Sequence, residues 1–405
     1  MHYIVNDERV NINIGFIIPF LVLPQLVMSI SGMSYGPSVC SSMYILTFVY
    51  LCRYRTFLSI LKNPSLVLWL FLLMYHYFSA YIRGNINVRP IDYYHAMKMY
   101  CSVCVYTYFL CVDTKTTLKR LIHCLYIWLL LALVATGYDG GRLSGEKVIA
   151  VQFGKMSAIL TICVVFYSIL SNKKNIKIIL YCLFPIFIIL ISQTRNAFGM
   201  VAMILTAYYF FFRLKGRINP LTLIMIVIGC LIIFYGLDSF LAETKIGQRF
   251  SETDSYNYYY DKGYTTGTFF DKIAGERLIY YVLGFESFLQ EPIWGIGLNM
   301  YKTYVGGMYP MHVEYMVHLC EGGLVGASLY MTFLCSMAFL LKKTQLNDSM
   351  KKMLFSVFVI QLFTCMYSVC FNEEISCFPY ALIISSSINL LTNSCSIRNY
   401  KVNRY

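Results

Sequence analysis

EPIWGIGLNMYKTYVGGMYPMHVEYMVHLCEGGLVG, residues 291–326, ends the longest polar segment of the chain and begins a hydrophobic run. Four ionisable residues lie where this run begins: His312, Glu314, His318 and Glu321. Ionisable side chains at the mouth of a membrane span are functional candidates, because a charge in lipid is costly. The alternative is a structural one, in which a glycine-rich turn and interfacial histidines cap the span without chemistry.

The composition is that of a membrane protein. Hydrophobic residues make up 58% of the 405 residues, charged residues make up 13%, and the mean hydropathy is +0.60. The net charge of +13 does not indicate nucleic-acid binding, because lysine and arginine gather in short cytoplasmic loops for topological reasons. Membrane lipid is therefore an expected partner, and nucleic acid is not.

Twelve apolar runs are candidate spans, since a spanning helix needs about 20 apolar residues. They lie near residues 12–30, 37–52, 66–82, 94–112, 121–136, 149–170, 176–191, 197–212, 219–236, 313–341, 353–371 and 378–392. A basic segment follows every even-numbered run, which places those segments and both termini in the cytoplasm. We predict an all-α integral membrane protein, N-in and C-in, with about 12 transmembrane helices in one polytopic domain, 1–405.

The largest loop, residues 237–311 between helices nine and ten, is expected on the outward side. Residues 275–290 carry apolar side chains at helical spacing, which predicts an amphipathic helix on the membrane surface that ends before Pro292. Residues 251–270 are rich in tyrosine. They form either a sugar-binding lid or an aromatic belt at the lipid headgroups.

Arginines on the outward side run against the positive-inside bias, and three of them are candidate site residues: Arg142, Arg195 and Arg277. The guanidinium group is always charged, and its planar fork matches phosphate. Arg195 is the strongest candidate, because the motif SQTRNA (192–197) joins two apolar runs and an unpaired charge there is costly. The alternative to an anionic substrate is a carboxylate of the chain itself: Asp139, Glu276 or Glu291.

His312 is the candidate general base, since an imidazole titrates near neutral pH and can accept the proton of a sugar hydroxyl. His318 would point away from His312 on a continuous helix and is interpreted as structural. The sequence contains no GxGxxG or P-loop motif, no convincing metal-ligand set, and no acidic cluster for Mg²⁺ beside a nucleotide sugar. We expect no metal and no cofactor, so a donor sugar would arrive already activated on a lipid.

These motifs resemble those of the O-antigen polymerase and ligase superfamily of the Wzy and WaaL types. The resemblance rests on SQTRNA at Arg195, GER at Arg277, EPIWGIGLNMY, and His312 followed by GGLVG; RLSG at Arg142 and the large loop agree with it. It implies a metal-independent, inverting transfer of a glycan from undecaprenyl pyrophosphate to an acceptor hydroxyl. It also implies that Arg195 and Arg277 hold the pyrophosphate, assisted by Arg142, and that His312 is the essential histidine.

Within this superfamily the pattern favours a polymerase. The ligases have a polar residue after the histidine, then nine residues and GxxG, whereas Val313 follows His312 here and Gly323-Leu-Val-Gly326 lies at the expected distance. We expect polymerisation of O-antigen or capsular repeat units in the bacterial inner membrane, with the site facing the periplasm. The resemblance implies undecaprenyl-pyrophosphate-linked oligosaccharide as substrate, and a chain-length regulator protein is a candidate partner.

Two other functions stay open. One is an O-antigen ligase that transfers the glycan to lipid A core, and the other is a non-enzymatic polysaccharide transporter or flippase. Transporters of the two-bundle type have a long cytoplasmic linker in mid-chain, whereas the connection at residues 171–177 is short. Charges within the spans, which ion coupling requires, are also scarce.

Overall fold

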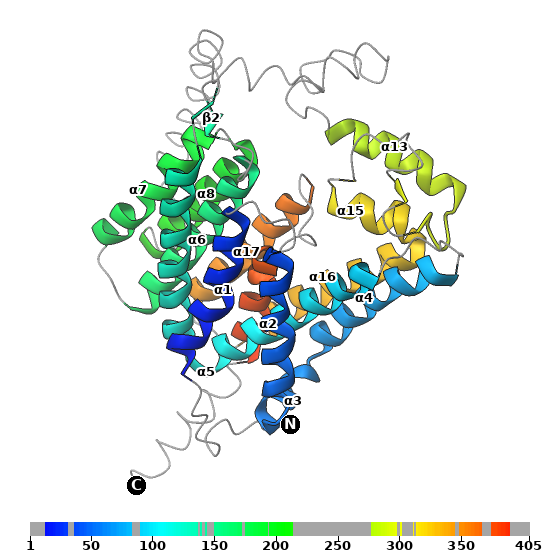
Figure 1. The fold of residues 1–405 in the computed structure, drawn as a ribbon, viewed down its shortest axis with the longest axis horizontal. Helices are drawn as coiled ribbons and strands as arrows, with labels where there is room; N and C mark the ends of the chain where they lie inside the picture. Colours follow the sequence, from blue (N-terminus) through cyan, green and yellow to red (C-terminus); the bar gives the residue numbers. More distant parts are fainter. Residues whose placement is uncertain are drawn as a thin grey trace.

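A computed structural model describes residues 13–30, 36–82, 90–136, 138–139, 142–143, 150–171, 175–192, 194–213, 277–297, 300–301, 311, 313–344, 348–366 and 374–388. Over these ranges the protein is helical except for one short hairpin. Most helices run alongside one another in a bundle, and α13 and α15 lie at one end of α4 and α16 (Figure 1).

The first part of the bundle contains α1 (Ile14–Ile30), α2 (Gly36–Leu51), α3 (Arg55–Leu61), α4 (Pro64–Ile82), α5 (Pro90–Ala135), α6 (Ala150–Leu170), α7 (Asn175–Ser192) and α8 (Arg195–Tyr208). The π-helix η1 (Tyr209–Arg213) extends α8. Strands β1 (Tyr138–Asp139) and β2 (Arg142–Leu143) pair antiparallel between α5 and α6, with Tyr138 opposite Leu143.

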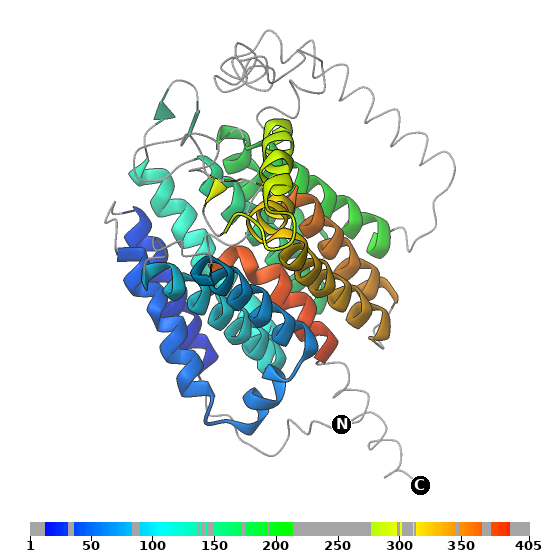
Figure 2. The same ribbon diagram turned by 90° about the vertical axis from the view of Figure 1, so that its right-hand side faces the viewer.

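The second part contains α13 (Arg277–Gln290), α15 (Glu314–Met316), the π-helix η2 (Val317–Glu321), α16 (Gly323–Lys343) and α17 (Asp348–Cys365). A last apolar helix covers Ile375–Ile388 and begins in the 3-10 turn η4 (Glu374–Cys377). Seen from the side, α13 lies across one end of the bundle (Figure 2).

The apolar runs predict most helices of the described residues, but α3 lies outside every run, and run 313–341 is divided into α15, η2 and α16. Runs 94–112 and 121–136 are two halves of α5 that meet at a kink at Asp113 (φ −149°, ψ 90°). The Asp113 carboxylate accepts hydrogen bonds from the backbone N (3.0 Å) and Oγ1 (2.7 Å) of Thr116. A side chain that accepts such bonds starts a new helix, so a capped kink joins the two runs.

Three helices of the described residues are long and apolar enough to cross a membrane: Met97–Ala135, Gln152–Leu170 and Gly323–Lys343. The pair Arg55–Leu61 and Pro64–Ser79, bent by 66°, would be a fourth. Five shorter apolar helices accompany them. The protein is therefore helical and suited to a membrane, while the number of twelve spans and the orientation stay predictions. The expected ninth span, 219–236, lies outside the described residues.

An aromatic cluster holds the helices around the candidate site together. Trp69 of α4 packs on Phe333 of α16 at a ring-centroid distance of 5.0 Å and on Tyr380 of the last helix at 5.7 Å. All three side chains are buried. Each aromatic ring removes a large apolar area from its surroundings, so this cluster fixes α4 against α16.

Helix α13 covers almost the range 275–290 that the sequence predicts to be helical. Tyr280, Leu283 and Ser287 are buried on one side of α13, whereas Val282 and Phe285 are half exposed on the other. A helix that packs on protein by one side and exposes apolar side chains on the other suits a membrane surface. Most of the loop 237–311, including the tyrosine-rich residues 251–270, lies outside the described residues.

A second, smaller core lies beneath α13. It contains side chains from α13, from the segment after it, and from the segment that leads into α16: Tyr280, Leu283, Ile296, Tyr301, Met311, Val313, Met316, Val317 and Cys320. Two tyrosines tie it to α17: the hydroxyl of Tyr315 donates to Leu362 O (2.9 Å) and that of Tyr281 to Met366 O (3.3 Å).

Candidate active site

The segment Glu291–Gly297 forms a turn that fits against the start of α16. Gly295 (φ 78°) and Gly323 (φ 63°) both adopt the left-handed conformation, which side chains disfavour. The two glycines also touch. A Cβ atom at Gly323 would lie 2.4 Å from Gly295 N, and one at Gly295 would lie 2.3 Å from Glu321 O. Glycine is therefore required at both positions.

The turn supplies donors to the end of η2. Ile296 N donates to Cys320 O (2.8 Å), and Gly297 N donates to Glu321 O (3.1 Å). The last carbonyl groups of a helix have no partner within the helix and need one elsewhere. These two hydrogen bonds provide it at the point where η2 stops.

The same turn supplies acceptors to the start of α16. Leu324 N donates to Pro292 O (2.8 Å), and Val325 N donates to Ile293 O (3.3 Å). The first N–H groups of a helix likewise lack partners within it. One turn therefore caps two helix ends, and the motifs WGIG and GGLVG have a structural basis.

Helix α4 closes the turn from the other side through Tyr75. Its hydroxyl shares hydrogen bonds with Gly322 O (2.8 Å) and Trp294 O (3.2 Å). Gly322 directly follows η2, and Trp294 lies in the turn Glu291–Gly297. Tyr75 thus connects both segments to α4 by hydrogen bonds.

The adjacent residue of α4, His76, belongs to a buried polar cluster that consists of His76, Glu314, His318 and Tyr330. A hydrogen bond of 2.7 Å joins His76 Nε2 and His318 Nδ1. On the other side of the ring, His318 Nε2 lies 3.5 Å from Glu314 Oε1. The rings of His318 and Tyr330 stack with their centroids 4.0 Å apart.

All four side chains of the polar cluster are at most 2% exposed. Buried polar groups are costly unless they are hydrogen-bonded, so they are found where they orient structure or carry chemistry. Two glycines make room for the cluster: a Cβ at Gly322 would meet His76 Cε1 at 2.9 Å, and one at Gly326 would meet it at 3.6 Å.

The polar cluster continues into the bundle through Tyr330. The Tyr330 hydroxyl lies 3.3 Å from Cys365 Sγ and 3.4 Å from the Tyr380 hydroxyl. Cys365 belongs to α17 and Tyr380 to the last helix. Side-chain contacts therefore link α4, the segment before α16, α16, α17 and the last helix.

Sequence reasoning missed His76. The argument about His318 assumed a continuous α-helix, whereas the chain forms three residues of α15 and then the π-helix η2, so the orientation of His318 relative to His312 stays a prediction. A π turn changes which side chains share a face and often marks a functional site. His76 could have been noticed as an ionisable residue within the apolar run 66–82, which is unusual in a span.

The structure places the backbone of three of the four predicted site residues. Arg142 is in β2, which packs against α7; Arg195 is the first residue of α8; Arg277 is the first residue of α13. His312 lies outside the described residues, as do the side chains of the three arginines. Whether these four side chains meet in one site stays a prediction.

The contacts between elements arrange the three arginine positions in two groups. Helix α7 contacts β2 and ends at Ser192, so the strand of Arg142 and the start of α8 at Arg195 belong to one region. Helix α13, which begins at Arg277, packs on α15 and η2, the elements that follow His312. The predicted arginines therefore belong to two regions of the described structure.

The start of α8 is closely packed and not capped by its own side chain. Thr194 Oγ1 hydrogen-bonds Ser192 Oγ (2.6 Å) and makes no capping bond to the helix. Thr194 lies on Gly154 of α6, where a Cβ would come within 2.4 Å of Thr194 Oγ1. The side chain of Thr194 thus does not cap the first N–H groups of α8, and such groups attract anions.

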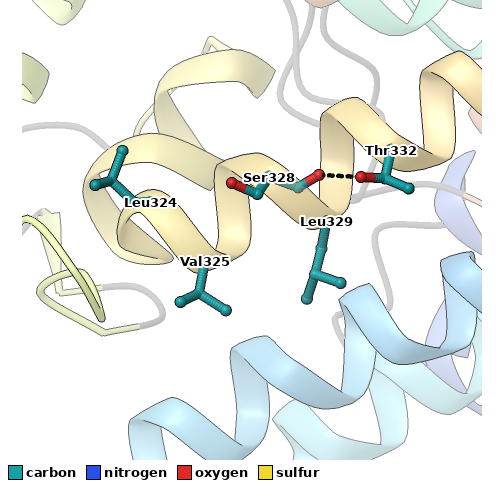
Figure 3. A pocket seen from close by; sticks show the side chains of 5 residues that line it. All are labelled: Leu324, Val325, Ser328, Leu329 and Thr332. Carbon is teal, nitrogen blue, oxygen red and sulfur yellow. Dashed lines mark hydrogen bonds between the residues drawn. The ribbon is translucent and has the colours of Figure 1, made fainter.

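A groove of about 320 Å³ runs along α16 and is lined by Leu324, Val325, Ser328, Leu329 and Thr332. Val325 and Leu329 point to the same side of the helix, and Thr332 Oγ1 donates to Ser328 O (Figure 3). The groove begins directly after the glycine turn. Its lining is mainly apolar, which suits a hydrocarbon chain better than a sugar.

The described residues contain no group of three or more His, Cys, Asp or Glu side chains arranged to hold a metal ion. Comparison with known families gives one match: residues 180–331 match the family model described as O-Antigen ligase. The matched range runs from α7 to α16 and includes Arg195, Arg277, His312 and the glycine turn. No curated protein matches the chain.

Proposed function

Because the chain belongs to the O-antigen polymerase and ligase superfamily, we propose that it polymerises O-antigen or capsular repeat units on the periplasmic face of the inner membrane. The observation that carries this proposal is the family match over residues 180–331, which covers the segment where Arg195, Arg277 and His312 lie. The glycosyltransferase-like activity of the superfamily is the general premise, and repeat-unit polymerisation is the specific proposal.

In the proposed reaction an acceptor hydroxyl attacks the anomeric carbon of a glycan on undecaprenyl pyrophosphate. A new glycosidic C–O bond forms, the bond to the pyrophosphate breaks, and the configuration inverts. His312 accepts the hydroxyl proton, and Arg142, Arg195 and Arg277 neutralise the charge of the departing pyrophosphate. Fixed charges aimed at a leaving group lower the barrier by several kcal/mol where water is excluded.

The start of α8 supports the role of Arg195. A helix N-terminus carries a partial positive charge, so an arginine as its first residue is unfavourable unless an anion is nearby. The guanidinium of Arg195 and the N–H groups of the first turn would bind the same anion. Arg277, the first residue of α13, has the same arrangement.

The surface near the turn supports a lipid-linked donor. Ile293, Trp294 and Leu324 are each more than half exposed, and they continue the apolar side of α13. Such a surface would lie at the headgroup level, with the pyrophosphate at the interface and the isoprenoid tail in the bilayer. The groove along α16 offers an apolar track for part of that tail.

A strain that lacks this gene tests the function. We expect single repeat units on lipid A core and none of the longer polymer, because ligation of one unit needs no polymerase. Electrophoresis of the lipopolysaccharide should show one band above core in place of a ladder, and the intact gene should restore the ladder.

The ligase is the second candidate, because the matching family model is described as O-Antigen ligase. A ligase deletion would leave core without any repeat unit while polymer stays on the lipid carrier. Absence of repeat units from the periplasm would instead indicate a flippase. Either result contradicts the proposed polymerase.

Arg195→Lys should strongly shorten the polymer while the amount of protein in the membrane is retained. Lysine keeps the charge but loses the planar fork that binds two phosphate oxygens at once. The ladder on a gel and an immunoblot of the same membranes measure both quantities. A normal ladder would mean that Arg195 is not part of the donor site.

Arg55→Lys is the matched control, because Arg55, like Arg195, is the first residue of a helix, α3. It lies in a segment that the charge pattern assigns to the cytoplasm. Its ladder should be unchanged.

A further inference from the structure

His76 connects two parts of the chain that are far apart in sequence. It lies in α4, and its hydrogen-bond partner His318 lies 242 residues further on, in the π-helix η2. His318 in turn contacts Glu314 at 3.5 Å, one helical turn earlier. Glu314 is two residues along the chain from His312. The contacts His76–His318–Glu314 therefore lead from a membrane helix to the segment that carries the candidate base.

We propose that His76 is a positioning residue, which fixes the segment 313–322 against α4 through His318 and so sets where His312 stands. This inference rests on the proposed function for the role of His312. His76 itself takes no part in the reaction.

The surroundings of His76 favour a specific fit over general packing. Its neighbour Tyr75 fastens the carbonyl groups of Gly322 and Trp294 from the same helix. The ring of His76 lies over Gly322 and Gly326, and a Cβ at Gly322 would come within 2.9 Å of it. Glycines are therefore present where an imidazole from α4 needs space.

Contacts with α16 and with the last helix hold α4 in place. Trp69, buried between Phe333 and Tyr380, holds α4 on α16 and on the last helix. Ser65 Oγ also hydrogen-bonds Ser336 Oγ at 2.6 Å. The segment 313–322 consists of Val313, α15, η2 and Gly322, and both helices in it are short. A hydrogen bond from a well-packed helix to a short segment fixes the position of that segment. Displacing a catalytic group by about 1 Å can lower the reaction rate roughly 10²-fold.

The test compares two substitutions at His76 in the full-length protein, reconstituted in vesicles with lipid-linked repeat units. His76→Leu removes the hydrogen bond and keeps the bulk, whereas His76→Gln keeps an amide that can bond His318 Nδ1. We expect His76→Leu to lower kcat by about 10- to 100-fold with little change in KM, and His76→Gln to restore most of the rate. His123→Leu, at an exposed histidine of α5, should have the wild-type rate.

A double substitution tests whether His76 acts through His318. If it does, His76→Leu combined with His318→Leu should lose no more rate than the more harmful single change, because the two share one interaction. Additive losses, or a kcat of His76→Leu equal to that of His123→Leu, would overturn the proposal. Equal losses in His76→Leu and His76→Gln would also overturn it, since packing alone would then be responsible.

Hydrogen–deuterium exchange provides a readout that needs no activity. Peptides from residues 311–322 should exchange faster in His76→Leu than in the wild type, and His76→Gln should restore the slow exchange. If the wild type transfers no repeat unit, the proposed function is wrong, and the exchange measurement alone then tests whether His76 positions the segment 313–322. Unchanged exchange in His76→Leu would then refute it.

Discussion

His312→Ala should leave the protein in the membrane at near wild-type amount and lower the rate of repeat-unit transfer by about 10²–10⁴-fold, the usual contribution of a general base. The sequence predicts that His312 lies where the large outer loop returns to the membrane, and in the proposed reaction an acceptor hydroxyl would meet an interfacial pyrophosphate close to it. If His312 only caps the span, its replacement would instead lower the free energy of unfolding by about 1–2 kcal/mol. Amount and rate must therefore be measured in the same membranes.

His123→Ala serves as the control, because this exposed histidine of α5 is outside the candidate site. It should change neither the amount of protein nor the rate. EDTA should leave wild-type transfer unchanged, since the proposed mechanism uses no metal. Normal polymer from His312→Ala, or loss of wild-type transfer in EDTA, would contradict a metal-free base mechanism.

The helices could be predicted because each carries its own signal. Apolar runs mark α2, α6 and α7 to within a few residues, and helical spacing marks α13. The kink in α5 has a local signal too, in the Asp113 and Thr116 pair that caps its second half. Such features depend on residues that are neighbours along the chain.

The centre of the candidate site could not be predicted in the same way, because its contacts are long-range. The pairing of His76 with His318 joins residues 242 positions apart, and the apolar run around His76 shows only that the residue is out of place. The π-helix η2 also has no reliable sequence pattern. The helical spacing argument assumed a continuous α-helix at His318, where the structure has a π-helix, whereas it correctly predicted α13.

The glycine motifs show how a resemblance and a structure complement one another. The resemblance noted in the sequence includes WGIG and GGLVG without giving a reason for them. In the structure, Gly295 and Gly323 meet so that one turn can cap both η2 and α16. The segment that follows His312 thus joins α16 at a closely packed junction, which the proposed role of His312 requires if its position is to be maintained.

Gly323→Ala should destabilise the protein severely and reduce its amount in the membrane. The left-handed conformation costs a residue with a side chain about 1–3 kcal/mol. The new Cβ would also lie 2.4 Å from Gly295 N and from Ile293 O, and backbone cannot move aside as a side chain can. Separating the turn from α16 would break hydrogen bonds such as Leu324 N to Pro292 O (2.8 Å), each contributing about 1 kcal/mol.

Thermal unfolding of the purified protein in detergent measures this effect, with an immunoblot of membranes for its consequence in cells. Gly199→Ala is the matched control, because Gly199 is inside α8 and a Cβ there would meet only Phe363, at 3.9 Å. That substitution should be neutral or slightly stabilising, since alanine favours a helix over glycine by about 1 kcal/mol. Equal unfolding temperatures for Gly323→Ala and Gly199→Ala would show that the contact between Gly295 and Gly323 does not hold the junction together.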